Sequence, residues 1–255
     1  MRALFLGTGT SVGVPQVGCR CEVCTSSDPR DKRTRPSLLL ETGGKRLLID
    51  IGPDFRAQML REGIDSVDAV LLTHAHADHI LGIDDLRAVN NRTGRSIPIY
   101  ATERTHAAVR RVFFYCFESD PYASRPRFEP RFFGEAPFEA EGVEAVPVRA
   151  IHGTMEVHGF RFGKFAYVTD AKVIPPESLA LLEGVEVLVL NALRFRDHPT
   201  HFTVDEACAV VEKVGPKRAF LTHMGHGIMH GRDSARLPAG VEFAWDGLEI
   251  EIGDG

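Results

Sequence analysis

The stretch LLTHAHADHI, residues 71–80, constrains the fold of this chain more than any other feature. An apolar run, DAVLLT, leads directly into four side chains of metal-binding type, namely His74, His76, Asp78 and His79. A short apolar run bounded by polar residues is typical of a buried strand. Burying such polar groups without partners would be costly, and a solvent-exposed loop would not explain their crowding. We therefore predict a strand over 68–73 that ends in a metal site.

The spacing within this cluster favours two metal ions. Alternate residues of an extended segment face the same way, so His74 and His76 can hold one ion. Asp78 and His79 lie one turn further on and can face a second ion. A hydrolytic metal keeps an open coordination position and needs further ligands from elsewhere. Three polar residues at the ends of apolar runs are candidates, although each alone could equally be an ordinary turn residue: His152, Asp170 and His223.

Strand-like runs alternate with helical patterns along the whole chain. Strands are predicted at 2–7, 37–42, 45–50, 68–73, 97–102, 143–150, 159–169, 185–192 and 218–223. Helices are predicted at 54–63, 80–90 and 203–215, after Glu103 and after Pro176. Both halves open with strands and continue with αβ units that end in histidine-bearing strand exits. This plan indicates an α/β fold with two β-sheets, each covered by helices.

Several turns and caps can be assigned from local residue types. Gly43-Gly44 predicts a hairpin, and Asp246-Gly247 predicts another within 241–252. Thr203 and Glu206 have the spacing of a capping box, and Asp54 is a candidate helix cap. Residues 115–137 are rich in Phe, Pro and Arg without a clear period, so we expect an irregular excursion there.

The motif THAHADH, followed in order by His152, Asp170 and His223, resembles the metallo-β-lactamase superfamily of hydrolases. The resemblance implies a four-layer αββα sandwich in a single hydrolase domain over residues 1–255. It also implies how the ligands are shared. One metal would be held by His74, His76 and His152, the other by Asp78, His79 and His223, and Asp170 would bridge them.

The segment GCRCEVC, residues 18–24, holds three of the five cysteines. Together with His226 in LTHMGHG they have the composition of a closed structural zinc site, made of Cys19, Cys21, Cys24 and His226. A redox pair of Cys21 and Cys24, or free surface thiols, are the alternatives. The loop LGTGTSVGVPQVGCRCEVC, with FAWDGLEI, resembles the phosphoribosyl 1,2-cyclic phosphate phosphodiesterase branch of the carbon–phosphorus lyase pathway. That branch implies an extra zinc site in this loop.

The predicted metal ligands and the resemblance together imply hydrolysis of a small phosphodiester, including a cyclic ribose phosphate. Two divalent ions, zinc or manganese, would share a hydroxide and clamp a phosphoryl oxygen. We expect His201 to protonate the leaving group, and Asp78 to serve in catalysis as well as in binding. Arginines between 104 and 131 form either a solvated face or a grip on substrate phosphate. A thioesterase, a lactonase, a nuclease and a non-catalytic metal-stabilised binding module are the alternatives.

The composition indicates which binding partners and which cellular compartment to expect. A formal charge of −5 argues against a general nucleic-acid binder, and no apolar run has membrane-spanning length. An odd number of clustered cysteines favours a reduced, cytoplasmic protein over a secreted disulfide framework. A homodimer is implied only by the resemblance.

Overall fold

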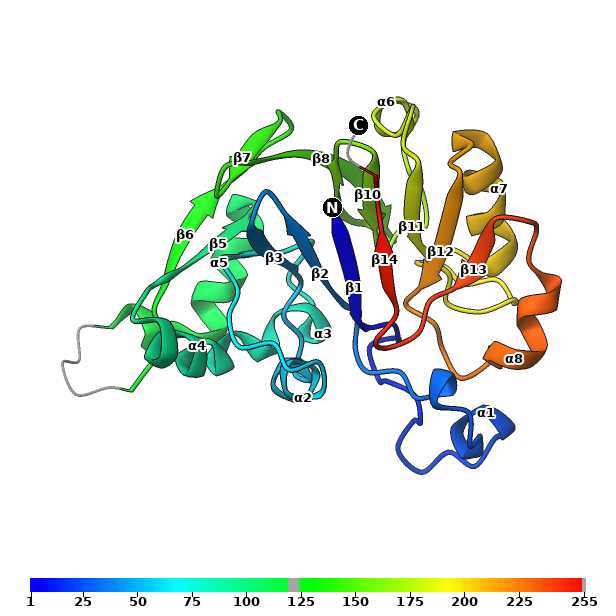
Figure 1. Ribbon diagram of the computed structural model, residues 1–255, viewed down its shortest axis with the longest axis horizontal. Coiled ribbons are helices and arrows are strands. Elements are labelled where there is room, and N and C mark those ends of the chain that lie inside the picture. Colours follow the sequence, from blue (N-terminus) through cyan, green and yellow to red (C-terminus); the bar gives the residue numbers. More distant parts are fainter. Residues whose placement is uncertain (119–123, 254–255) are drawn as a thin grey trace.

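Two β-sheets pack face to face in the computed structural model, which describes residues 1–118 and 124–253 (Figure 1). The first sheet has the order β14 (Glu249–Glu251), β1 (Arg2–Gly7), β2 (Ser37–Thr42), β3 (Lys45–Ile49), β4 (Ala69–Leu71), β5 (Ile97–Ala101) and β6 (Phe128–Phe132). The second has the order β13 (Val241–Phe243), β12 (Arg218–Thr222), β11 (Val187–Asn191), β10 (Phe165–Val168), β9 (Met155–Phe162), β8 (Val143–His152) and β7 (Phe138–Ala140). Each sheet combines antiparallel strands with a parallel run, β3 to β6 in the first and β10 to β13 in the second.

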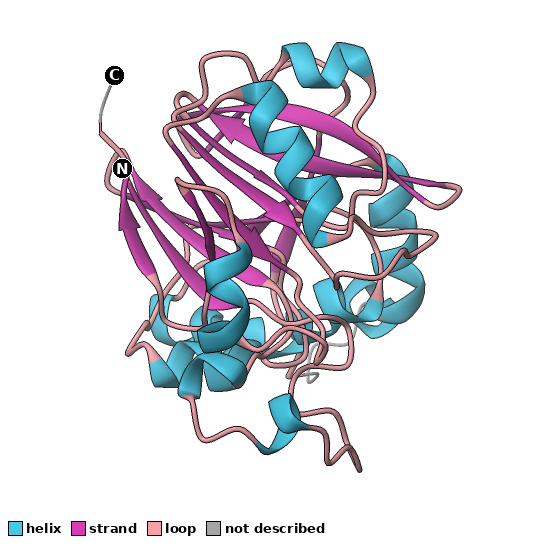
Figure 2. Ribbon diagram, turned by 90° about the vertical axis from the view of Figure 1, so that its right-hand side faces the viewer, coloured by secondary structure: helices cyan, strands magenta, loops and turns pink. Residues whose placement is uncertain are grey.

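Helices cover the outer faces of both sheets (Figures 1 and 2). Those of the first half are α2 (Phe55–Arg61), α3 (Ala77–Ile80), α4 (Leu86–Thr93) and α5 (Glu103–Val112). Those of the second half are α6 (Pro176–Ala180), α7 (Val204–Val214) and α8 (His230–Asp233), while α1 (Glu22–Thr25) lies in the cysteine loop. No helix in the described residues combines the length and the hydropathy that a membrane span needs. The predicted four-layer αββα sandwich is confirmed.

Side chains along each strand point alternately to the core between the sheets and to the helices outside. In β1, Ala3 and Phe5 face the core between the sheets, whereas Leu4 and Leu6 face the helical layer. In β11, Val187 and Val189 likewise face inward and Leu188 and Leu190 outward. Because successive strand side chains point to opposite faces, a strand buried on both sides must be apolar throughout. This explains the continuous apolar runs in the sequence.

Two of the predicted local signals are confirmed. The strands β2 and β3 pair as an antiparallel hairpin around Gly43-Gly44. At the start of α7, the Glu206 N–H donates to the Thr203 hydroxyl and the Thr203 N–H donates to the Glu206 carboxylate, which is a capping box. These two signals depend only on residues close together in the sequence.

The predicted hairpin at Asp246-Gly247 is wrong. The strand before it, β13, pairs with β12 in the second sheet, and β14 pairs with β1 in the first, so the chain crosses between sheets. The Asp246 carboxylate accepts hydrogen bonds from the backbone and hydroxyl groups of Thr8 and Thr34. These contacts anchor the crossover between the two sheets.

Two further predictions need correction. Asp54 makes no side-chain cap on α2, because its carboxylate accepts hydrogen bonds from the Arg35 backbone N–H and guanidinium. The single helix expected at 80–90 is divided into α3, a 3-10 segment and α4. The Gly82 N–H donates to the Ile51 carbonyl, which ties this segment to the chain after β3.

The excursion expected at 115–137 is partly regular. Its second half contains β6, which extends the first sheet beside β5. Residues 119–123 lie outside the described residues.

Candidate metal centre

The candidate ligands sit where strands of both sheets end. His74 follows β4 in the first sheet, while Asp170 and His223 follow β10 and β12 in the second, and His152 is the last residue of β8. The short helix α3 contributes Asp78 and His79. The carboxyl ends of parallel strands meet at one edge of a sheet, which is where α/β folds place their sites.

Two of these strand exits, and the exit of β3, share an unusual backbone conformation. Asp50 after β3, Asp170 and His223 have φ values of 61°, 58° and 57°. The left-handed region is disfavoured for residues other than glycine and costs roughly 1–3 kcal/mol at each site. Such strain is typical of functional sites, because it aims a side chain in a direction that relaxed backbone would not allow.

Asp170 lies between His79 of α3 and His223, which follows β12 in the second sheet. Its Oδ2 is 3.3 Å from His79 Nε2 and its Oδ1 is 3.2 Å from His223 Nε2. Asp78 Oδ2 lies 3.3 Å from His79 Nε2 and 3.6 Å from His223 Nε2. The donor atoms of Asp78, His79 and His223 are all within 4.8 Å of one another, as are those of His74, His79 and Asp170.

The remaining histidines surround the same point. His74 Nε2 is 2.9 Å from His76 Nδ1, and the His152 ring lies 5.2 Å from that of His76. His201 joins the group, because its donor atom is within 4.8 Å of those of His152 and Asp170. The structure therefore brings together all seven side chains predicted as active-site ligands, with His201 beside them. Their division between two ions stays a prediction.

Three of the imidazoles are held through Nδ1. The partners are the Thr73 hydroxyl for His74, the Asp50 carboxylate for His79 and the Thr200 carbonyl for His152, at 2.9, 2.7 and 2.8 Å. Such hydrogen bonds fix the ring and make Nε2 the nitrogen that can bind a metal.

Several buried nitrogens of the cluster have no hydrogen-bond partner in the described part of the chain. They are His79 Nε2, His201 Nδ1 and both ring nitrogens of His223. Since buried polar atoms are almost always hydrogen-bonded, so many ring nitrogens without a hydrogen bond in one place call for an explanation. Imidazole and carboxylate ligands around a shared point suit divalent cations. The residues present therefore fit a metal centre.

The charges in the cluster are strongly coupled. Burial lowers the pKa of His79, but Asp50, Asp170 and Asp78 outweigh it and raise that pKa well above the ordinary value. Burial raises the pKa of Asp170, but His223 and His79 outweigh it and hold that pKa well below the usual range. Burial first, and then His223, lowers the pKa of His201 to about 3. His201 is therefore neutral near pH 7.

Asp50 is the functional candidate that sequence reasoning missed. It is fully buried, and besides His79 it accepts hydrogen bonds from the backbone and hydroxyl groups of Thr73. Like Asp170, it is an aspartate directly after an apolar strand. That shared position was the signal that could have found it.

We expect Asp50→Asn to lower metal affinity or activity by about 10- to 100-fold, because outer-shell partners of metal-binding histidines have effects of this size. The amide would no longer offer His79 a charged acceptor. Titration of the purified variant with Mn²⁺, followed by activity, measures the effect. An unchanged metal affinity in a folded variant would mean that Asp50 only supports the backbone.

The second donor cluster lies in the cysteine loop. His226 Nδ1 is 3.3, 3.5 and 3.6 Å from the sulfurs of Cys19, Cys21 and Cys24. Zinc–sulfur and zinc–nitrogen bonds of ordinary length place tetrahedral ligands about 3.5 Å apart. A hydrogen bond from the Cys24 backbone N–H is the main cause that lowers the pKa of Cys21 to about 6, whereas burial raises the pKa of Cys24 to about 11. The cysteines all lie in the described part of the chain and none of them forms a disulfide there, so the four predicted residues fit a structural zinc.

A family description, "Beta-lactamase superfamily domain", matches residues 45–224 and so covers most of the chain. The chain belongs to the beta-lactamase superfamily. The matched span contains every candidate ligand of the active site, from His74 to His223. The cysteines of the loop lie outside it.

Three similar proteins are informative. The crystal structure of a protein described as a new diphosphatase from the PhnP family is 43% identical, with a TM-score of 0.93 and coverage of 99% of this chain and 98% of that one. An octanoyltransferase of Porphyromonas gingivalis is 41% identical over 99% of this chain, which spans only 52% of that protein. Zinc-bound PqqB from Methylobacterium extorquens is 19% identical with a TM-score of 0.80 over 99% of this chain and 100% of that one, which shows the shared fold alone.

Proposed function

We propose that this protein, a hydrolase of the metallo-β-lactamase fold, is a phosphodiesterase that uses two divalent cations. One observation carries the proposal: six donor side chains converge around the carboxylate of Asp170, with His201 next to them. The phosphoryl substrate class is supported by the 43% identical relative, which is described as a diphosphatase. The predictions of a homodimer and a cytoplasmic location stay untested.

Each residue has a distinct task in this proposal. His74, His76 and His152 would hold one cation, Asp78, His79 and His223 the other, and Asp170 would contact both. The cations, when bound, polarise a phosphoryl oxygen and bring the pKa of water towards neutrality. Asp50, Thr73 and the Thr200 carbonyl keep the imidazoles in place. Zinc and manganese both suit this donor set.

His201 is the proposed proton donor to the leaving alkoxide. A neutral imidazole is too weak an acid for this task, so the role requires a pKa of His201 that rises when the negatively charged substrate binds beside it. Its ring lies 4.5 Å from that of His152 and 4.8 Å from that of His223, so it borders the ligand set. A place among the ligands is the alternative, because His201 also groups with His152 and Asp170.

His201→Ala separates these two roles. We expect the variant to slow a diester with an alkoxide leaving group by about 10²–10⁴-fold, and one with p-nitrophenolate far less, because p-nitrophenolate needs little protonation. The measurement is kcat/KM for both substrates at equal metal loading. Equal losses on the two substrates, with a loss of bound metal, would make His201 a ligand instead.

Diphosphate cleavage is a second candidate, because the relative at 43% identity is described as a diphosphatase. Both reactions break a phosphorus–oxygen bond and need the same charge stabilisation. Octanoyl transfer has weaker support, since this chain corresponds to about half of the protein with that name. A screen of metal-loaded protein against bis(p-nitrophenyl) phosphate, a diphosphate ester, p-nitrophenyl octanoate and a β-lactam distinguishes these classes. Turnover of the acyl ester alone would refute the proposed function.

A further inference from the structure

Arg33 is the largest fully buried side chain among the described residues, with 1% of its surface exposed. Burying a guanidinium is costly unless hydrogen bonds and an opposite charge compensate for the lost water. The Arg33 side chain makes four hydrogen bonds, all to groups of the protein. A buried polar group with a full set of partners fixes those partners in place, so they indicate its role.

Two of these hydrogen bonds end on the segment that carries His226. Arg33 Nη1 donates to the Gly225 carbonyl at 3.1 Å, and Nη2 donates to the Ile228 carbonyl at 2.9 Å. These carbonyls lie one residue before His226 and two residues after it. The guanidinium therefore holds the segment on both sides of His226, whose Nδ1 lies 3.3, 3.5 and 3.6 Å from the three cysteine sulfurs.

Asp31 strengthens this anchor. Its Oδ1 accepts hydrogen bonds from Arg33 Nη2 at 3.0 Å and from the His230 backbone N–H at 2.8 Å. Both side chains of the ion pair are buried. The pair therefore binds the chain at Gly225, at Ile228 and at the start of α8.

The backbone of Arg33 is joined to the cysteine loop. The Val14 N–H donates to the Arg33 carbonyl at 2.8 Å, and the Arg33 N–H donates to the Val14 carbonyl at 2.7 Å. Val14 belongs to a small apolar cluster with Val23 and Cys24. One residue therefore contacts both parts of the Cys3His set. Its backbone is bound to the loop with the cysteines, and its side chain is bound to the segment with the histidine.

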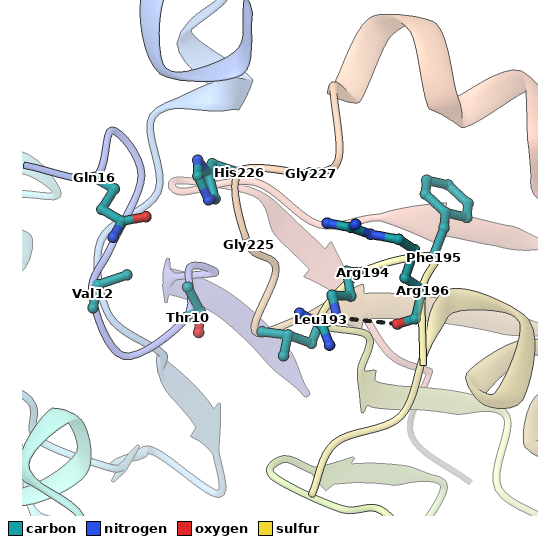
Figure 3. A pocket seen from close by; sticks show the side chains of 10 residues that line it. All are labelled: Thr10, Val12, Gln16, Leu193, Arg194, Phe195, Arg196, Gly225, His226 and Gly227. Carbon is teal, nitrogen blue, oxygen red and sulfur yellow. Dashed lines mark hydrogen bonds between the residues drawn. The ribbon is translucent and has the colours of Figure 1, made fainter. Parts of the chain in front are cut away.

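The segment around His226 needs such an anchor, because its own residues do not fix its course. A glycine lies on each side of His226, and glycine has the most accessible backbone conformations of any residue. A Cβ added at Gly227 would meet no atom within 4 Å. The segment also borders a pocket of about 290 Å³ that separates it from Thr10 and Leu193 (Figure 3). Packing around His226 is therefore sparse, and the hydrogen bonds from Arg33 hold its position.

We propose that Arg33 is a positioning residue for the structural zinc site, whose guanidinium directs His226 towards the three cysteine sulfurs. Arginine suits this task because its planar fork has donors in fixed directions and can bind two carbonyls and a carboxylate together. A lysine ammonium keeps the charge but lacks the fork. The inference does not depend on the proposed function, because it concerns the cysteine site and not the substrate.

His223 has separate anchors, although it lies in the same loop. The next residue, Met224, donates its N–H to the Thr8 carbonyl at 2.8 Å and accepts a hydrogen bond from the Thr10 N–H at 3.1 Å. Loss of the Arg33 fork should therefore affect the metal held by His226 and not the ions held by His223.

Arg33→Lys tests the fork at constant charge. We expect the zinc affinity of the cysteine site to fall by about 10- to 100-fold, the size of effect shown by groups that orient metal ligands. The measurement is competition for zinc between the full-length protein and a chromogenic chelator. Arg30→Lys is the matched control, because Arg30 lies in the same loop and pairs with Asp28 at the surface, where ion pairs contribute little. Wild-type affinity in Arg33→Lys, or an equal loss in Arg30→Lys, would overturn the proposal.

A double variant separates positioning from folding. Arg33→Met combined with Asp31→Asn leaves no buried charge unpaired, and the Asn oxygen can still accept the His230 N–H. We expect its zinc-free form to melt close to the wild type, yet to bind zinc about 10- to 100-fold more weakly. Cobalt(II) bound in place of zinc reports the ligands, and its visible bands should change because His226 is no longer held against the sulfurs.

Wild-type zinc affinity and an unchanged cobalt spectrum in the double variant would show that Arg33 only supports the fold. Binding of Mn²⁺ to the active site should equal that of the wild type in both variants. A variant that loses this Mn²⁺ but keeps the zinc would also contradict the proposal.

Discussion

Asp170→Asn is expected to reduce phosphodiester hydrolysis by about 10³-fold or more. The Asp170 carboxylate lies 3.3 Å from His79 and 3.2 Å from His223, which are proposed ligands of one cation. It also groups with His74 and with His152, which are proposed ligands of the other, so it is placed to contact both. Stabilisation by metal ions supplies several kcal/mol, and each 1.4 kcal/mol corresponds to tenfold in rate. The measurement is kcat/KM with bis(p-nitrophenyl) phosphate in the presence of Mn²⁺.

Asparagine is the appropriate replacement because Asp170 has a φ of 58°. Asn tolerates the left-handed region better than most residues, so the backbone should keep its course. Asp65→Asn is the matched control, because it removes an exposed carboxylate that pairs with Arg46 and Arg92 on the surface. Surface ion pairs contribute little, so the control should remain active and stable. Near-normal turnover by Asp170→Asn would exclude the bridging role.

Cys21→Ser and His226→Ala should each remove one tightly held zinc per chain and lower the stability by about 2 kcal/mol or more. For a chain of this size that corresponds to a fall in Tm of roughly 4–8 °C. The reason is that the zinc would tie the cysteine loop to the segment after β12, and metal binding free energy adds to folding free energy. Metal analysis after mild chelation and a thermal melt measure both effects.

His223→Ala is the matched control for His226→Ala, because the two histidines are three residues apart in one loop. His223 faces Asp170 and Asp78, whereas His226 faces the three cysteine sulfurs. We therefore expect His223→Ala to abolish activity and to keep the tightly held zinc. A His226→Ala protein that retains this zinc but loses an active-site ion would show that the two sites are wrongly assigned.

The metal centre was accessible from the sequence because its signals are local. His74, Asp170 and His223 each follow an apolar run directly, and a strand exit can be recognised without knowledge of its neighbours. Asp50 follows a strand in the same way, but only the tertiary structure shows that its carboxylate meets His79, 29 residues further along the chain. The ligand residue types could be predicted from local patterns, whereas the contact between Asp50 and His79 could not.

The wrong hairpin prediction also arises from tertiary contacts that a local pattern does not reveal. Asp246-Gly247 has the local signature of a hairpin, yet Asp246 binds Thr8 and Thr34 from the start of the chain and anchors a crossover between sheets. Tertiary contacts of this kind override a turn preference. The pocket between Thr10, Leu193 and His226 is likewise built from three segments distant in sequence, so no local pattern could have indicated it (Figure 3).

The most direct test of the account is a metal titration of protein whose active site has been emptied by mild chelation. Hydrolysis of bis(p-nitrophenyl) phosphate is followed as Mn²⁺ is added, together with the amount bound per chain. We predict that two further ions bind per chain, beyond the zinc that is retained, and that activity rises as the second of them binds. Full activity with one added ion, or with none, would contradict a two-cation phosphodiesterase.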